Sequence, residues 1–124
     1  MGAGRTEFAM SLFGRSWGTN VSGRIRLEGR EIALPSVAAA IDAGLAYVTE
    51  DRKQLGLVLI NNIMHNTTLA NLKAVAGGGI IDEHQERKVA TDYRSRLRIR
   101  SHSIYQEAVN LSGGNQQKLS LIHI

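Results

Sequence analysis

The sequence predicts an α/β fold, and three observations lead to that prediction. A glycine-rich run at residues 1–7 stands directly before a helical pattern, and short strand-like segments alternate with helices up to residue 61. Beyond that point the strand pattern fades and helical patterns dominate. Alternating strands and helices are typical of layered α/β proteins. We therefore expect an incomplete α/β core over residues 1–61 and a helical subdomain over residues 62–118.

Length and composition restrict the class of protein. The chain has 124 residues, of which 43% are hydrophobic and 21% charged, and it contains no cysteine. This length suits one domain or a part of one, and the apolar fraction is too high for a disordered chain. No apolar run approaches the roughly 20 residues that cross a bilayer, and we expect no signal peptide. The lack of cysteine excludes disulfides, thiolate zinc sites and cysteine nucleophiles.

The first elements follow from local signals. Apolar residues at helical spacing predict a helix over residues 6–13. The alternation of polar and apolar residues over 23–29 predicts a strand that ends in a turn. Pro35 in a first turn and Gly44 beyond the last turn predict a short helix over residues 36–43.

Two segments complete the expected core, and a helix opens the second half. The apolar run 45–48 predicts a buried strand, and the charged, turn-forming run 49–56 predicts a loop. A helix that ends at the glycines 77–79 is expected to place one apolar face on Leu69, Leu72 and Val75.

A further helix is expected to begin at Asp82. Its side chain is a typical N-cap, and Gln85 three residues later completes the capping-box pattern. Helical spacing predicts that the buried stripe of this helix consists of Val89, Tyr93 and Leu97.

The first motif with chemical content is the run Gly2-Ala3-Gly4-Arg5-Thr6. Glycines let backbone N–H groups turn toward an anion, and the helix start adds a partial positive charge. A phosphate loop normally ends in Gly-Lys-Ser/Thr. Here Arg5 replaces the lysine, Thr6 keeps the hydroxyl, and the first glycine of the pattern is absent. On spacing alone, a tight turn before a helix fits equally well.

The second motif is the run Leu111-Ser112-Gly113-Gly114-Asn115-Gln116-Gln117-Lys118. Ser112 is a good N-cap, and the paired glycines let the backbone approach a ligand closely. The free amides of the helix that follows would face an anion. On capping physics alone, an ordinary loop and cap is the alternative interpretation.

These motifs resemble those of ATP-binding cassette proteins. The run 111–118 is similar to the signature motif, residues 1–7 to the end of a degenerate phosphate loop, and residues 46–53 to the Q-loop region, where Glu50 takes the glutamine position. Over residues 1–118 the chain resembles the second nucleotide-binding domain of the double-cassette ATPases of bacterial monosaccharide importers, nearest their xylose and multiple-sugar members. The resemblance implies a partial P-loop ATPase domain.

The family's mechanism implies a division of labour between two cassettes that sandwich ATP and Mg²⁺ head to tail. The signature of one cassette faces the phosphate loop of the other. The degenerate loop formed by Gly2, Ala3, Gly4, Arg5 and Thr6 would then belong to a weak or non-hydrolytic site, with Thr6 as a magnesium ligand. The active site built mainly by the first cassette domain of the same parent chain would be completed by Ser112, Gly113, Gly114 and Gln116. The fragment alone is expected to be inactive.

The resemblance also implies partners and a location. The helical subdomain and the Q-loop would contact the membrane permease subunits, and a periplasmic sugar-binding protein would act with them indirectly. The parent would couple ATP binding and hydrolysis to the uptake of a xylose-, galactose- or ribose-type sugar. It would lie peripherally at the cytoplasmic face of the bacterial inner membrane, and no nucleic-acid partner is expected.

Two other functions fit parts of the sequence. The formal net charge of +4 and the arginines at 94, 96, 98 and 100 are compatible with a basic nucleic-acid-binding module. A solvated helix face gives the same charge pattern. An independent phosphoryl-transfer enzyme is not favoured, because no second acidic metal ligand follows an apolar strand.

Residues 119–124 depart from the family pattern. The string Leu-Ser-Leu-Ile-His-Ile resembles a translated sequencing adapter, so we expect a non-native tail with no native surface to bury against. Because the family's intervening strand is missing, His123 is not expected to act as the switch histidine.

Overall fold

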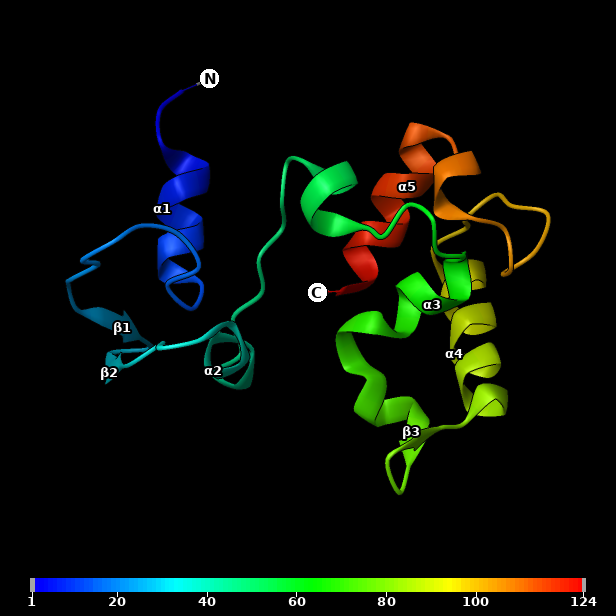
Figure 1. Cartoon of the computed structure of the whole chain (residues 1–124), viewed down its shortest axis with the longest axis horizontal. Coiled ribbons are helices and arrows are strands. Elements are labelled where there is room, and N and C mark those ends of the chain that lie inside the picture. The colour runs from blue at the N-terminus through cyan, green and yellow to red at the C-terminus, as the bar shows by residue number, and fades with distance from the viewer. Residues whose placement is uncertain (1, 124) are drawn as a thin grey trace. The chain divides into compact units, whose positions relative to one another are not determined.

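The computed structural model describes residues 2–123, with side chains through residue 122, and the chain forms two compact units (Figure 1). Unit 1 spans Met1–Tyr47 and unit 2 spans Val48–Ile124. This division differs from the one expected at residue 61. The reason is that Leu57 and Leu59 pack against the core of unit 2, which draws the preceding segment into that unit.

Unit 1 combines two short helices with a β-hairpin. Helix α1 (Arg5–Leu12) follows Gly4 and agrees closely with the expected helix. Strand β1 (Ile25–Leu27) pairs antiparallel with β2 (Arg30–Ile32). The strand expected over residues 23–29 is therefore the first arm of a hairpin. Its three-residue partner carries two charged residues and is too short for its alternation to be detected.

Helix α2 (Val37–Asp42) begins at an N-cap serine. The Ser36 hydroxyl accepts a hydrogen bond from the Ala39 N–H at 3.2 Å. Pro35 therefore lies one residue before the cap and not in the first turn, where it was expected. Gly44 follows the helix with a φ of 86°, which suits its expected role at the helix end.

The buried strand expected over residues 45–48 does not form. The segment is irregular, and the Val48 side chain is 58% exposed. Leu45 and Tyr47 instead line an open apolar hollow of ≈ 260 Å³ within unit 1, and the Tyr47 ring lies 6.0 Å from that of Phe13. A strand needs neighbouring backbone for its N–H and C=O groups. Among residues 2–123 none pairs with this segment.

Gly14 sets how closely the end of α1 approaches the start of α2. It is buried and has a φ of 72°. A Cβ atom at this position would lie 2.1 Å from the Val37 nitrogen and 2.2 Å from the Ser36 carbonyl carbon. Only a residue without a side chain fits here, because both contacts are with backbone.

Unit 2 begins with a short π-helical turn, η1 (Arg52–Gly56), where a loop was expected. The Asp51 carboxylate caps this turn by accepting a hydrogen bond from the Gln54 N–H at 3.1 Å. Helix α3 (Ile63–Thr68) follows and is capped by the side chain of Asn62. A short polar side chain thus starts each of these elements.

The next helix differs from the expected one. The 3₁₀ segment η2 (Leu69–Val75) is kinked at Asn71, which has a φ of −142°, and of the expected apolar face only Val75 is buried. Strand β3 (Ala76–Gly77) then pairs with β4 (Ile80–Ile81). The glycines at 78 and 79 both have positive φ and form the turn of this hairpin, so they do more than end a helix.

Helix α4 (Glu83–Arg96) begins where it was expected. The Asp82 carboxylate accepts hydrogen bonds from the His84 N–H at 2.9 Å and the Gln85 N–H at 3.2 Å, which confirms the N-cap. The reciprocal half of the capping box is absent. The Asp82 N–H donates to the Val75 carbonyl at 2.7 Å, so a tertiary contact replaces the Gln85 side chain.

The buried face of α4 is rotated from the expected stripe. Glu86 and Ala90 are buried, whereas the three expected residues are only half-buried. The Thr68 hydroxyl donates to the Glu86 carboxylate at 2.7 Å and ties α4 to α3. Because Glu86 is polar, a search for apolar residues at helical spacing does not identify it as part of the buried face. The expected buried residues were Val89, Tyr93 and Leu97.

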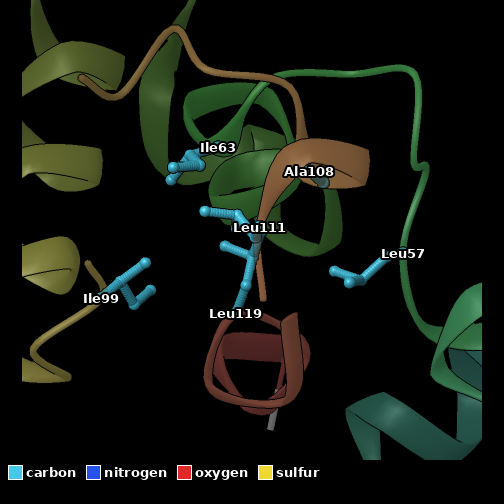
Figure 2. Close-up of a cluster of buried hydrophobic side chains, with 6 residues drawn as sticks. All are labelled: Leu57, Ile63, Ile99, Ala108, Leu111 and Leu119. Carbon is cyan, nitrogen blue, oxygen red and sulfur yellow. The ribbon is translucent and has the colours of Figure 1, made fainter. Parts of the chain in front are cut away.

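The core of unit 2 joins residues from five parts of the chain (Figure 2). Its members are Leu57, Ile63, Ile99, Ala108, Leu111 and Leu119. Ala108 lies in the 3₁₀ turn η3 (Ala108–Asn110), and Leu119 lies in helix α5 (Gly113–Ser120). A second buried cluster consists of Met64, Ala90 and Ile104.

The expectation that residues 119–124 have nothing to bury against is wrong. Leu119 is 0% exposed, and Figure 2 shows it reaching from α5 toward Leu111. Ile122, in the 3₁₀ turn η4 (Leu121–His123), packs against the same cluster. The side chain of His123 lies outside the described part of the structure, so the expectation about its role stays a prediction.

The layered α/β core is present only in part. Between residues 2 and 123 the sheets are two separate antiparallel hairpins of two strands each. In the same range no helix is long and apolar enough to span a membrane.

We expect Gly14→Ala to destabilise unit 1 by more than about 2 kcal/mol, because left-handed backbone costs an alanine about 1 kcal/mol and overpacking adds roughly 1–3 kcal/mol. The measurement is urea unfolding followed by the fluorescence of Trp17, the single tryptophan of the chain. Gly29→Ala is the matched control, since Gly29 has a φ of 80° but its Cβ would meet nothing within 4 Å. Equal losses in the two variants would contradict the close approach.

We expect Leu119→Ala to destabilise unit 2 by about 2–5 kcal/mol, because it leaves a cavity in the core. Leu121→Ala is the control: Leu121 is 41% exposed, and its truncation should cost less than about 1 kcal/mol. Unfolding is followed by helical circular dichroism. Deletion of residues 119–124 should also lower the helical signal, and an unchanged melting temperature would show that the tail does not pack.

Candidate functional site

The turn Ser112–Gly114 presents main-chain groups at the surface of unit 2. Ser112 occupies the N-cap position of α5, with φ −60° and ψ 154°, and it is exposed together with Gly113 and Gly114. No side chain caps the first amides of the helix. An uncapped helix start offers free N–H donors and a partial positive charge. This combination suits an anion such as a phosphate.

The Ser112 hydroxyl does not perform the capping role expected of it. Its position as N-cap is as expected, but its oxygen accepts a hydrogen bond from the Asn115 side-chain nitrogen at 3.1 Å. The first amides of α5 therefore remain uncapped.

Two polar side chains of α5 hold the helix in place. Gln116 is 5% exposed, and its amide donates to the Ala108 carbonyl at 3.0 Å. The Lys118 ammonium donates to the Arg98 carbonyl at 3.1 Å. Gln116 thus lies inside the fold, which differs from the ligand-binding role that the resemblance implies for it. Of the expected ligand-binding residues in this run, Ser112, Gly113 and Gly114 are exposed.

A cation lies beside this turn. A Cβ atom at Gly113 would be 3.1 Å from the Arg52 Nη2 atom, so the guanidinium occupies the space that a side chain would need. The buried Nε atom of Arg52 has no hydrogen-bond partner within the described part of the chain. The structure thus brings the segment similar to a Q-loop next to the turn similar to a signature. Spacing along the sequence gives no signal for this contact.

Glu50 lies in the same charged run as Arg52. Its side chain is exposed and lines a shallow hollow of ≈ 300 Å³ with its three neighbours to residue 53. An acidic group at the rim of this hollow is open to contacts with another chain.

The N-terminal motif forms an exposed helix start in unit 1. Gly2 and Gly4 have φ values of 79° and 69°, and α1 has no side-chain cap. Ala3, Arg5 and Thr6 are all exposed. Over residues 2–123 no group of three His, Asp or Glu gathers that could hold a metal ion. Among the described residues the Thr6 hydroxyl is the one expected Mg²⁺ ligand, and a single hydroxyl is insufficient for a metal site.

Two of the four arginines that favoured nucleic-acid binding make side-chain contacts within unit 2. The Arg94 guanidinium donates to the Ser101 hydroxyl at 2.7 Å and also to the Ser101 carbonyl. Arg96 pairs with Asp92 at 3.4 Å, and its guanidinium lies 5.7 Å from the centre of the Tyr93 ring. Arg94 and Arg96 are therefore already engaged by groups of this unit.

Comparison with known proteins finds relatives along almost the whole chain. It is 47% identical over 121 residues to the L-arabinose transport ATP-binding protein AraG of Geobacillus stearothermophilus, which covers 98% of this chain and 24% of the relative. It is 44% identical over 121 residues to the ribose import ATP-binding protein RbsA of Rhodopirellula baltica, with the same coverage. It is 41% identical over 121 residues to the xylose import ATP-binding protein XylG of Geobacillus kaustophilus, again with 98% and 24% covered.

The similarity to these relatives covers only part of their length. It spans about a quarter of the length of the curated relatives it matches. No protein-family model matches it, and no solved structure does. Over this segment the chain is homologous to sugar-import ATP-binding proteins, which confirms the resemblance read from its motifs.

Proposed function

We propose that the chain is a segment of the ATP-binding subunit of a bacterial monosaccharide importer and that its turn Ser112–Gly114 is the signature that binds a terminal phosphate. One observation carries the proposal: an uncapped, exposed helix start lies in the run that resembles a cassette signature. Relatives named for arabinose, ribose and xylose import support the monosaccharide class.

The turn would contribute hydrogen-bond donors to a composite ATP site. The amides of Gly113 and Gly114 and the Ser112 hydroxyl would face the terminal phosphate, and Gln116 would support the turn from inside the fold. Donors held in place before reaction stabilise the charge that develops during phosphoryl transfer. The phosphate loop and the remaining catalytic groups of this site would come from the first cassette domain of the parent chain, so one segment alone is incomplete.

The remaining residues would have supporting roles in the parent. The exposed run Gly2–Thr6 would form a degenerate phosphate loop at a weak or non-hydrolytic site, because Arg5 replaces the usual lysine. Glu50 would lie at the Q-loop position, near the permease subunits that unit 2 would contact. A periplasmic sugar-binding protein would act with the permease, and the ATPase would lie peripherally at the cytoplasmic face of the inner membrane.

The proposal predicts that the chain alone does not turn over ATP. Among the described residues no acidic side chains gather that could hold the metal, and the phosphate loop of the composite site would come from the first cassette domain. These groups supply most of the acceleration. The measurement is phosphate release from Mg·ATP by the purified 124-residue chain. Sustained magnesium-dependent turnover would contradict the composite site.

In the full-length parent, Gly114→Asp should lower ATPase activity and sugar uptake by about a hundredfold or more, because it places a carboxylate beside the amide donors and this charge repels the phosphate. Gly114 has open space around its Cβ, so this loss would not come from misfolding. Gly77→Asp is the matched control, since Gly77 also has open space and lies in the β3–β4 hairpin.

Arg5→Ala in the parent tests the asymmetry of the two sites. Because Arg5 belongs to the weaker site, its loss should reduce activity much less than Gly114→Asp does. The same two assays of ATP hydrolysis and sugar uptake compare them. Equal losses from the two changes would overturn the division into a strong and a weak site.

A further inference from the structure

We infer that Asn115 is a positioning residue that keeps the Ser112 hydroxyl free to donate a hydrogen bond to phosphate. The inference rests on the proposed function, because it concerns the same turn. Three hydrogen bonds carry it. The Arg100 N–H donates to Asn115 Oδ1 at 3.1 Å, and Asn115 Nδ2 donates to the Arg100 carbonyl at 3.2 Å and to Ser112 Oγ at 3.1 Å.

The contact with the Arg100 backbone fixes the orientation of the Asn115 amide. A backbone N–H only donates, so the amide atom that faces it is the oxygen. A backbone C=O only accepts, so the other amide atom is the nitrogen. This pairing leaves one N–H of the Asn115 side chain, and that N–H points at Ser112 Oγ.

The direction of this last bond determines what the Ser112 hydroxyl can do. Its oxygen is the acceptor, so its own proton is not used in the bond to Asn115. An N-cap serine normally accepts from an amide of the first turn of its helix, and Ser112 does not. The turn therefore presents one O–H and the uncapped N–H groups of α5. A surface of donors alone matches a phosphate, which is rich in acceptors.

Helix α5 is bonded at two points to the backbone of residues 98–100. Asn115 makes the first contact. Lys118, nearly one turn further along the helix, donates to the Arg98 carbonyl. Asn115 is thus held by backbone on one side and holds Ser112 on the other. Its effect on a ligand is expected to pass through the Ser112 hydroxyl, which makes it distinguishable from a purely structural residue.

The test is a phosphate titration of the ¹⁵N-labelled 124-residue chain, followed by the amide shifts of Gly113 and Gly114. Inorganic phosphate is the probe, and chloride at equal ionic strength is the reference. Ser112→Ala should raise the apparent Kd about tenfold, the value of one hydrogen bond to a charged group, and Ser112→Thr should restore it. Asn115→Ala should raise the Kd about three- to tenfold for the same reason.

The double variant Ser112→Ala/Asn115→Ala separates positioning from structure. If Asn115 acts through the hydroxyl, the double variant binds phosphate within about twofold of Ser112→Ala alone. If the increase in Kd of the double variant equals the product of the two single-variant increases, the inference is wrong. It is also wrong if Asn115→Ala binds phosphate with the Kd of the wild type. Gln117→Ala is the matched control, because it removes an exposed amide from the same helix and should leave the Kd unchanged.

A second variant covers the case in which Asn115→Ala does not fold. Asn115→Asp keeps an acceptor for the Arg100 N–H, but its second carboxylate oxygen would accept a hydrogen bond from the Ser112 O–H, which would then no longer be available to the phosphate. It should abolish the response of Gly113 and Gly114, whereas Gln117→Glu should only weaken it. If the wild-type chain responds to phosphate and Asn115→Asp responds equally, the inference about Asn115 is wrong, whereas the phosphate role of the turn stands. A wild-type chain that does not respond to phosphate would overturn both the inference and the phosphate role of the turn.

Discussion

The burial of Leu119 in the core of unit 2 is the contact on which the candidate site depends. It anchors α5 against Leu111 and Ile63, residues that come from outside the helix. Burying a leucine side chain contributes about 2 kcal/mol, and this apolar contact holds the helix without using its polar groups. The start of α5 can then remain uncapped at the surface, although free amides there contribute nothing to the stability of the helix.

The polar side chains of α5 divide into those that support the helix and those that remain open. Gln116 reaches inward to the Ala108 carbonyl, and Asn115 and Lys118 reach the backbone at residues 98–100. The bond from Gln116 satisfies a buried carbonyl that would otherwise lose its hydrogen bond with water, whereas the bonds of Asn115 and Lys118 lie at the surface. The support behind the turn leaves Ser112, Gly113 and Gly114 free for a ligand. A binding surface made of backbone amides needs such a fixed frame, because it has no side chains that can adjust.

The charges around the turn also favour an anion. The Arg52 guanidinium lies beside Gly113, at the positive end of the α5 dipole, and its Nε atom is buried without a partner in the described residues. Two positive groups at one place repel each other unless a negative charge lies between them. A terminal phosphate would supply that charge. The segment that resembles a Q-loop and the turn that resembles a signature thus meet at one electrostatic site within unit 2.

The sequence by itself determined what depends on neighbouring residues. The N-cap at Asp82, the helix that begins at Arg5 and the glycine-rich turn before α5 follow from local hydrogen-bonding chemistry. Only the tertiary structure decided the features that need a distant partner. Residues 45–48 have strand composition, but no strand in the described part of the chain pairs with them, and the expected cap partner of Asp82 is replaced by the Val75 carbonyl. Gln116 turns inward and Leu119 is buried because of residues outside their own helix, since the core gathers five separated segments and no local pattern specifies which of them meet.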